Sequence, residues 1–214
     1  MSTANVDFKL AVGLVMAGAC MAQTWELGAG VGYGSYRNGT ITSPGGTADA
    51  GVRNRYVVTG VVNQEMSDRI AGEVRYVFQA GENFLSSGST QGQVLAQSHA
   101  VHYDILVHLA PRDHRIRPFV AGGIGAKFYE TTGSTPVPQP LPRVASLTNQ
   151  SQWRAVYVFG GGVRVRVKDH LILRADLRDY LTAFPVKLFS PVANATTQGL
   201  FHQITPMVGL GYSF

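Results

Sequence analysis

Hydrophobic and polar residues alternate with a period of two along most of this chain. In the last segment, Val208, Leu210, Tyr212 and Phe214 alternate with Met207, glycines and a serine. A period of two places successive side chains on opposite faces of a β-strand. The pattern predicts eight strands with polar or glycine-rich connections between them. These strands are expected at residues 24–36, 51–63, 69–80, 96–110, 116–129, 151–167, 170–181 and 200–214.

The connections between the predicted strands alternate in length. Three are short polar turns, at residues 64–68, 111–115 and 168–169. Four are long and rich in Gly, Ser, Thr, Pro and Gln, at residues 37–50, 81–95, 130–150 and 182–199. Short turns at one end and long loops at the other are typical of transmembrane β-barrels in outer membranes. We therefore expect an all-β fold: an eight-stranded antiparallel up-and-down transmembrane β-barrel.

One face of each predicted strand is apolar, and the other carries the charges. Leu173 and Leu177 share one face of the seventh segment, whereas Arg174 and Arg178 share the other. An arginine at the bilayer midplane costs roughly 2–4 kcal/mol, so the charges are expected to point into the lumen. The alternative, a soluble barrel with an apolar interior, has the same alternation with the faces exchanged. The expected lumen charge network comprises Glu26, Arg53, Arg55, Glu73, Arg75, Asp104, Lys127, Arg164, Arg166, Arg174, Asp176 and Arg178.

The lumen of an eight-stranded barrel is only wide enough for side chains to fill it. Both signs of charge are present, so ion pairs can satisfy most of these groups, and the excess of arginine requires water, backbone carbonyls or bound anions. A plugged polar core is the favoured interpretation. A narrow, anion-preferring pore is the alternative.

Outward aromatic residues are expected in two belts at the membrane interfaces. One belt lies at the rim of the short turns, where Tyr212 and Phe214 also fall, and the other lies towards the long loops. The predicted members are Trp25, Tyr33, Tyr56, Phe78, Phe128, Trp153 and Tyr157.

Residues 8–22 carry one lysine and then an unbroken apolar run. This run is too short to span a bilayer of roughly 30 Å and is typical of a secretory signal peptide. We expect a cleavable signal peptide at residues 1–22 and one barrel domain at residues 23–214. Cleavage after Ala22 removes the only cysteine, Cys20; cleavage before Cys20, as in a lipoprotein, is a minor alternative.

Composition narrows the function classes. The mean hydropathy of +0.04 and the lack of long apolar runs after residue 22 argue against helical membrane spans. The formal net charge is +5, but the basic residues are spread over the strands rather than clustered, so a nucleic-acid partner is not expected.

The ending Ile204–Phe214 resembles the C-terminal β-signal of bacterial outer-membrane proteins, which the barrel-assembly machinery reads. With the leader, the eight strands and the cores Pro118–Gly125 and Gly160–Arg164, the mature chain is similar to the OmpA-like and OmpX-like outer-membrane β-barrel family. The resemblance covers the barrel only, because no peptidoglycan-binding domain follows Phe214. In this family the assembly signal corresponds to Val208, Leu210, Tyr212 and Phe214.

This resemblance implies a location in the bacterial outer membrane and a structural, adhesive or surface-interaction role. It implies outer-membrane lipid and lipopolysaccharide as surroundings, and the barrel-assembly machinery and periplasmic chaperones as partners during biogenesis. An extracellular ligand could bind at the long loops, where the proline-rich segment Pro136–Pro142 forms a stiff spacer.

We expect neither catalysis nor a cofactor. Some barrels that resemble this one modify lipid A, and a hydrolase would need Ser, His and an acid together near the outer leaflet. His99, Asp179 and His202 are predicted to face outward, and Asp179 and His202 could approach each other near Ser190 or Thr182. A His–Asp pair that contacts lipid headgroups is the favoured interpretation, and a lipid A hydrolase is the alternative.

A metal site is not expected either. His102, Asp104 and His108 share the lumen face of one strand, but spacings of two and four residues separate them by roughly 7 and 13 Å. We therefore assign them to the polar lumen.

Overall fold

The computed structural model describes residues 24–133, 137, 139–197 and 200–214, so the predicted signal peptide lies outside the described residues. Eight long strands form the body of the molecule. They are β1 (Trp25–Arg37), β4 (Arg55–Glu65), β5 (Ile70–Ser87), β6 (Thr90–His108), β7 (Ile116–Thr131), β8 (Ser151–Arg166), β9 (Leu171–Ala183) and β11 (Leu200–Ser213).

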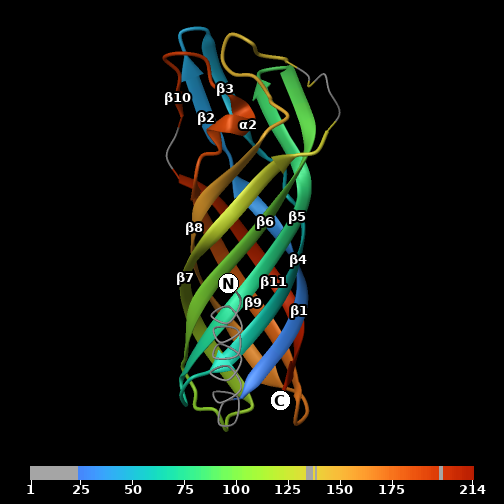
Figure 1. Cartoon of the computed structure of the whole chain (residues 1–214), viewed down its shortest axis with the longest axis vertical. Helices are drawn as coiled ribbons and strands as arrows, with labels where there is room; N and C mark the ends of the chain where they lie inside the picture. The colour runs from blue at the N-terminus through green and yellow to red at the C-terminus, as the bar shows by residue number, and fades with distance from the viewer. Residues whose placement is uncertain (1–23, 134–136, 138, 198–199) are drawn as a thin grey trace, which may run out of the picture.

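Each of these strands pairs antiparallel with the next one in the sequence, and β1 pairs with β11 to close the cylinder (Figure 1). At the seam, Trp25 and Phe214 exchange two backbone hydrogen bonds of 3.0 and 2.9 Å. The predicted fold class is thus confirmed: a closed, eight-stranded, antiparallel β-barrel. Among the described residues, no helix is long and apolar enough to span a membrane.

The long connections contain more structure than expected. The predicted loop 37–50 is largely a hairpin of β2 (Gly39–Ser43) and β3 (Gly46–Val52), and β3 pairs with the outer part of β5. The predicted loop 81–95 is mostly strand, because β5 and β6 continue to a tight turn in which Gly88 adopts a φ of 57°. The prediction of loops here was wrong because polar composition does not show which strands supply hydrogen-bond partners.

Two smaller elements complete this end of the molecule. Helix α2 (Val186–Phe189) follows β9, and β10 (Thr196–Thr197) pairs with β2. We call this end, with β2, β3, β10, α2 and the extensions of β5 and β6, the cap (Figure 1). The C-terminus lies at the opposite end with the short turns, which is the periplasmic end in outer-membrane barrels.

The barrel wall is apolar outside and polar inside. Along β9, Leu173 and Leu177 are exposed while Arg174 and Arg178 are buried. The same pattern holds on the other strands, so most of this outer face can meet hydrocarbon without exposing a charge, and the outward Asp179 lies near the cap end of β9. Other exposed outward residues include Leu27, Val31, Val58, Val74, Tyr103, Ile124, Phe159, Val208 and Leu210.

The cap has the opposite arrangement, with an apolar core. It brings together segments far apart in the sequence, from β1, β3, β5 and β6 to α2 and β11. The buried members of this cluster are Tyr36, Ile41, Ala48, Ala50, Val52, Leu85, Val94, Tyr129, Val144, Ala145, Leu147, Phe184, Leu188, Phe189 and Phe201. The described part of the proline-rich segment contributes to it, since Val137 and Leu141 pack against this core.

Candidate functional site: the lumen network and its periplasmic mouth

The lumen network is centred on Glu73, whose side chain is fully buried. Its carboxylate pairs with three arginines, at 2.7 Å to Arg75, 2.6 Å to Arg174 and 3.5 Å to Arg178. Because charge-assisted hydrogen bonds to carboxylates are strong, this cluster ties β5 to β9 across the lumen.

Two further acids complete this layer. Arg75 also contacts Asp176 at 2.5 Å, and Arg178 contacts Asp104 at 2.8 Å. His102 Nδ1 lies 2.7 Å from the other oxygen of Asp104. Glycines give these groups room: a Cβ on Gly162 would lie 2.7 Å from Asp176 Oδ1.

A second layer lies nearer the periplasm. Arg117 donates to both carboxylate oxygens of Glu65, at 2.8 and 3.2 Å, and Arg164 bridges Glu65 and Glu26. Arg164 also donates to His108 Nε2 at 3.1 Å. Two of these residues, Glu65 and Arg117, were missing from the expected network, since the sequence pattern assigned Glu65 to a turn.

The buried ion pairs balance. The two layers contain five arginines and five carboxylates, all less than a tenth exposed: Arg75, Arg117, Arg164, Arg174, Arg178, Glu26, Glu65, Glu73, Asp104 and Asp176. The expected excess of arginine inside these layers was therefore wrong. Two cavities that border the barrel interior hold only about 10 Å³ each.

Lys127 lies in a separate layer at the boundary with the cap. Its ammonium group donates to Tyr36 Oη at 3.1 Å and to Gln203 Oε1, and it lies 4.9 Å from the ring centroid of Tyr129. Tyr36 and Gln203 in turn donate to Gln79 Oε1, at 2.7 and 2.9 Å. This polar layer separates the charged lumen from the apolar core of the cap.

Three other predicted members lie outside the ion-pair layers. Arg53 and Arg55 are half-exposed and pair with Glu82, because they lie at the cap end of β4 rather than within the barrel. Arg166 lies at the periplasmic mouth, where it donates to the backbone carbonyl of Arg112 at 2.7 Å. Assigning Arg53 and Arg55 to the lumen was wrong, since alternation fixes the face of a residue but not its height along the barrel.

The predicted aromatic residues lie on the outer face of the barrel. Tyr33 packs edge-on against Tyr56, with ring centroids 5.6 Å apart, and Phe128 packs against Trp153 at 4.8 Å. Phe78 packs against His99 on the same face, Tyr157 is exposed and Trp25 is half-buried at the opposite end. In the terminal strand, Val208, Leu210, Tyr212 and Phe214 are all exposed on the outer face.

The outward His–Asp pair is present. His202 Nδ1 lies 2.9 Å from Asp179 Oδ2, and both side chains are about a third exposed. Thr182 does not face this pair, because its hydroxyl is buried inside and lies 2.9 Å from Tyr129 Oη. Ser190 lies in the cap after α2. Within the described residues, no serine or threonine hydroxyl is hydrogen-bonded to His202.

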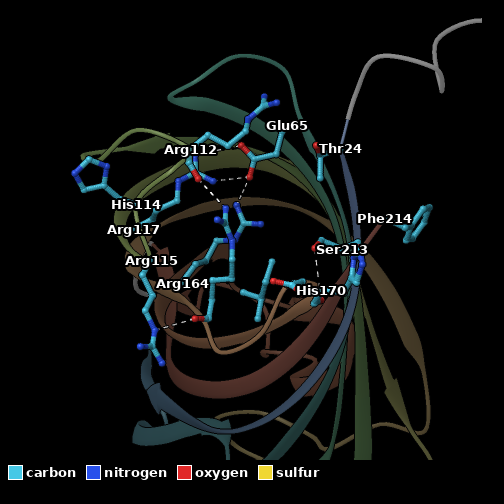
Figure 2. A pocket seen from close by; sticks show the side chains of 13 residues that line it. Thr24, Glu65, Arg112, His114, Arg115, Arg117, Arg164, His170, Ser213 and Phe214 are labelled. Atoms are coloured by element: carbon cyan, nitrogen blue, oxygen red, sulfur yellow. Dashed lines mark hydrogen bonds and ion pairs between the residues drawn. The ribbon is translucent and has the colours of Figure 1, made fainter.

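A cavity of about 310 Å³ opens at the periplasmic mouth (Figure 2). Arg164 projects across it towards Glu65, and Ser213 and His170 line the opposite wall. Its other charged lining residues come from the turns that precede β7 and β9 and from the strand ends: Arg112, His114, Arg115, Arg117, Arg166 and Asp169. In the part of the chain that the structure describes, no group of three or more His, Cys, Asp or Glu residues could hold a metal ion.

Comparison with known proteins supports the fold. No protein-family model and no curated protein matches the sequence. Neisserial surface protein A (NspA) superposes with a TM-score of 0.54 at 11% identity, over 89% of this chain and 97% of that chain. The N-terminal β-barrel domain of Pseudomonas aeruginosa OprF gives a TM-score of 0.49 at 12% identity, over 89% and 97%. The superposition on NspA therefore agrees with the closed barrel fold of this chain and with its apolar outer face.

Proposed function

We propose that this protein is a closed outer-membrane barrel that holds a folded extracellular cap for structural or adhesive contacts at the cell surface. The observation that carries the proposal is the apolar core of the cap, in which Ile41, Leu85, Leu188 and Phe189 are fully buried. Such a core gives the connections a fixed shape, and a fixed surface binds with a smaller loss of conformational entropy than loose loops do.

The ion pairs in the lumen support a role in which the barrel does not conduct ions. Five buried arginines are matched by five buried carboxylates, and the layer around Lys127 and Gln79 follows above them. An ion that crossed the barrel would have to break charge-assisted pairs in both layers. The competing function, a narrow anion-preferring pore, requires these pairs to open.

Two measurements test this proposal. In planar bilayers the purified protein should give no stepwise currents, and steps with anion preference would instead establish the pore. Cells that express the full chain should adhere better to a surface coated with extracellular matrix than cells that lack it. Leu85→Asp, which places a charge in the cap core, should abolish the gain while the barrel remains inserted. Equal adhesion by all three strains would refute the adhesive role.

A lipid-modifying activity is the second candidate, and the hydrogen bond between His202 and Asp179 favours it. Ser35 lies on the same outer face of β1, opposite Ile204, which is itself opposite Asp179. This register places a hydroxyl on the strand next to His202, as nucleophilic catalysis requires. The mass spectrum of lipid A from expressing cells tests the activity. A mass change lost in both Ser35→Ala and His202→Ala would establish it, and an unchanged spectrum would remove it.

We further propose the biogenesis that the sequence suggests. Residues 1–22 would be removed as a signal peptide, and the exposed side chains of Val208, Leu210, Tyr212 and Phe214 would be read by the barrel-assembly machinery with the help of periplasmic chaperones. The outward apolar face would then contact outer-membrane lipid and lipopolysaccharide.

A further inference from the structure

The cavity at the periplasmic mouth differs from the lumen above it in its charge balance. Its lining side chains include five arginines and two histidines but only two carboxylates, those of Glu65 and Asp169. Glu65 is already bound by Arg117 and Arg164, the two arginines at the inner end of the cavity. The guanidinium groups of Arg112, Arg115 and Arg166 therefore have few carboxylates nearby to neutralise their charge.

These three arginines bind backbone carbonyls instead of acids. Arg112 donates to Ser67 O at 3.0 Å, Arg166 to Arg112 O at 2.7 Å, and Arg115 to Arg166 O at 3.1 Å. The contacts fix the guanidinium groups around the opening without neutralising them. Nearby Asp113 is bound by His114 at 3.0 Å, and this hydrogen bond lowers the pKa of Asp113.

Unused donors also remain at the inner end. Arg117 and Arg164 are only 5% and 4% exposed, and the Nε atom of each is buried without a hydrogen-bond partner. The Nε atom of Arg112 is also buried and unpartnered. Arg53, Arg154, Arg174 and Arg178 also have a buried Nε atom without a hydrogen-bond partner, so this feature is not confined to the cavity, and the argument for a ligand rests on the charge of its lining.

We propose that this cavity is a binding site for a phosphate-bearing anion that enters from the periplasmic side. Planar guanidinium groups bind phosphate oxygens in bidentate pairs, and the cavity volume of about 310 Å³ accommodates a phosphate with its substituent. The phosphate could belong to the headgroup of an anionic lipid in the inner leaflet or to a soluble periplasmic molecule. The site does not depend on the role proposed for the cap.

The test is titration of the full chain, in nanodiscs of phosphatidylcholine, with inorganic phosphate at constant ionic strength. Binding is followed by the backbone amide chemical shifts of Ile172 and Ser213, which line the cavity and are kept in every variant. We expect the shifts to saturate with phosphate concentration. In the double variant Arg115→Gln/Arg166→Gln, the affinity for phosphate should fall about tenfold or more, because charged hydrogen bonds are lost. That variant keeps Arg117, Arg164 and Glu65, and heat-modifiable migration in detergent gels verifies that it is folded.

The matched control is Arg53→Gln/Arg55→Gln, which removes the same charge at the cap end and should leave the affinity unchanged. No saturable shifts, or equal weakening in both double variants, would overturn the proposal. A second titration in nanodiscs that contain phosphatidylglycerol identifies the source of the phosphate. Competition by this lipid assigns the site to a headgroup, and undiminished binding of inorganic phosphate assigns it to a soluble ligand.

Discussion

The barrel and the cap are built from the same strands but have opposite interiors. On the inner face of β5, Glu73 and Arg75 lie in the barrel, and Leu85 lies in the cap. On the outer face of the same strand, exposed Val74 gives way to Glu82, which pairs with surface arginines. Side chains alternate between the two faces along the whole strand. In the barrel the inner face is charged and the outer face apolar, whereas in the cap the inner face is apolar and the outer face is charged.

The exchange follows from the surroundings of each region. Around the cap there is water, so burying apolar side chains lowers the free energy through the hydrophobic effect. Around the barrel there is hydrocarbon. In hydrocarbon, burying apolar groups does not lower the free energy, and exposing a charge raises it strongly. Ion pairs therefore fill the lumen and apolar contacts fill the cap, with the layer of Lys127, Gln79 and Gln203 between them.

The largest expected effect comes from removing the central acid of the lumen. Glu73→Ala leaves Arg75, Arg174 and Arg178 without their common partner in a fully buried position. Breaking a buried pair by removing one partner costs about 3–5 kcal/mol, so the free energy of unfolding should fall by that amount in urea titrations of the protein in lipid vesicles.

The matched control on the same strand is Glu82→Ala, which removes a partly exposed ion pair with Arg53 and Arg55. Exposed pairs contribute about 0–1 kcal/mol, and this variant should unfold almost like the parent protein. Equal losses in the two variants would contradict the distinction between lumen and surface ion pairs.

An intermediate effect is expected from the cap core. Leu85→Ala removes a fully buried side chain and should destabilise the cap by about 2–5 kcal/mol through lost burial and a residual cavity. Limited proteolysis should then cleave the cap faster, while heat-modifiable migration of the barrel stays unchanged. Leu95→Ala, at an exposed position of β6, serves as the control. Loss of the barrel together with the cap would show that the two regions unfold as one unit.

A slightly smaller effect is expected when the outer face of the barrel receives a charge. Val208 is exposed on β11 among other apolar residues. Val208→Arg should cost about 2–4 kcal/mol if this position lies near the bilayer midplane, measured by the same urea titration. Gln93→Arg, on the exposed polar face of the cap, should be neutral. A neutral Val208→Arg would contradict the assignment of this face to lipid.

Much of the barrel could be predicted from the sequence because alternation is a local property. The eight strands, the inward face of Arg174 and Arg178, and the outward pair of Asp179 and His202 all follow from counting residues along one strand. Strand pairing in the barrel is also mostly local, since each barrel strand pairs with the next one along the chain, whereas the seam between β1 and β11 joins distant segments.

The rest depends on contacts between distant segments. The sequence placed Arg53 and Arg55 in the lumen and omitted Glu65 and Arg117, since the height of a residue along the barrel depends on the register of several strands. The hairpin of β2 and β3 and the long extension of β5 and β6 were predicted as loops, because their stability comes from the apolar core of the cap.

By itself, then, the sequence determined which side chains share a face of each strand, since a period of two places alternate residues on opposite faces. The cost of a charge in hydrocarbon then predicted which face of the barrel strands points inward. Only the tertiary structure decided which charges meet. It matched five arginines with five acids in the lumen, left the periplasmic mouth basic, and gave the cap a core of its own. The physical reason is that ion pairing and apolar packing act through distances across the barrel, and the order of residues along a strand does not specify them.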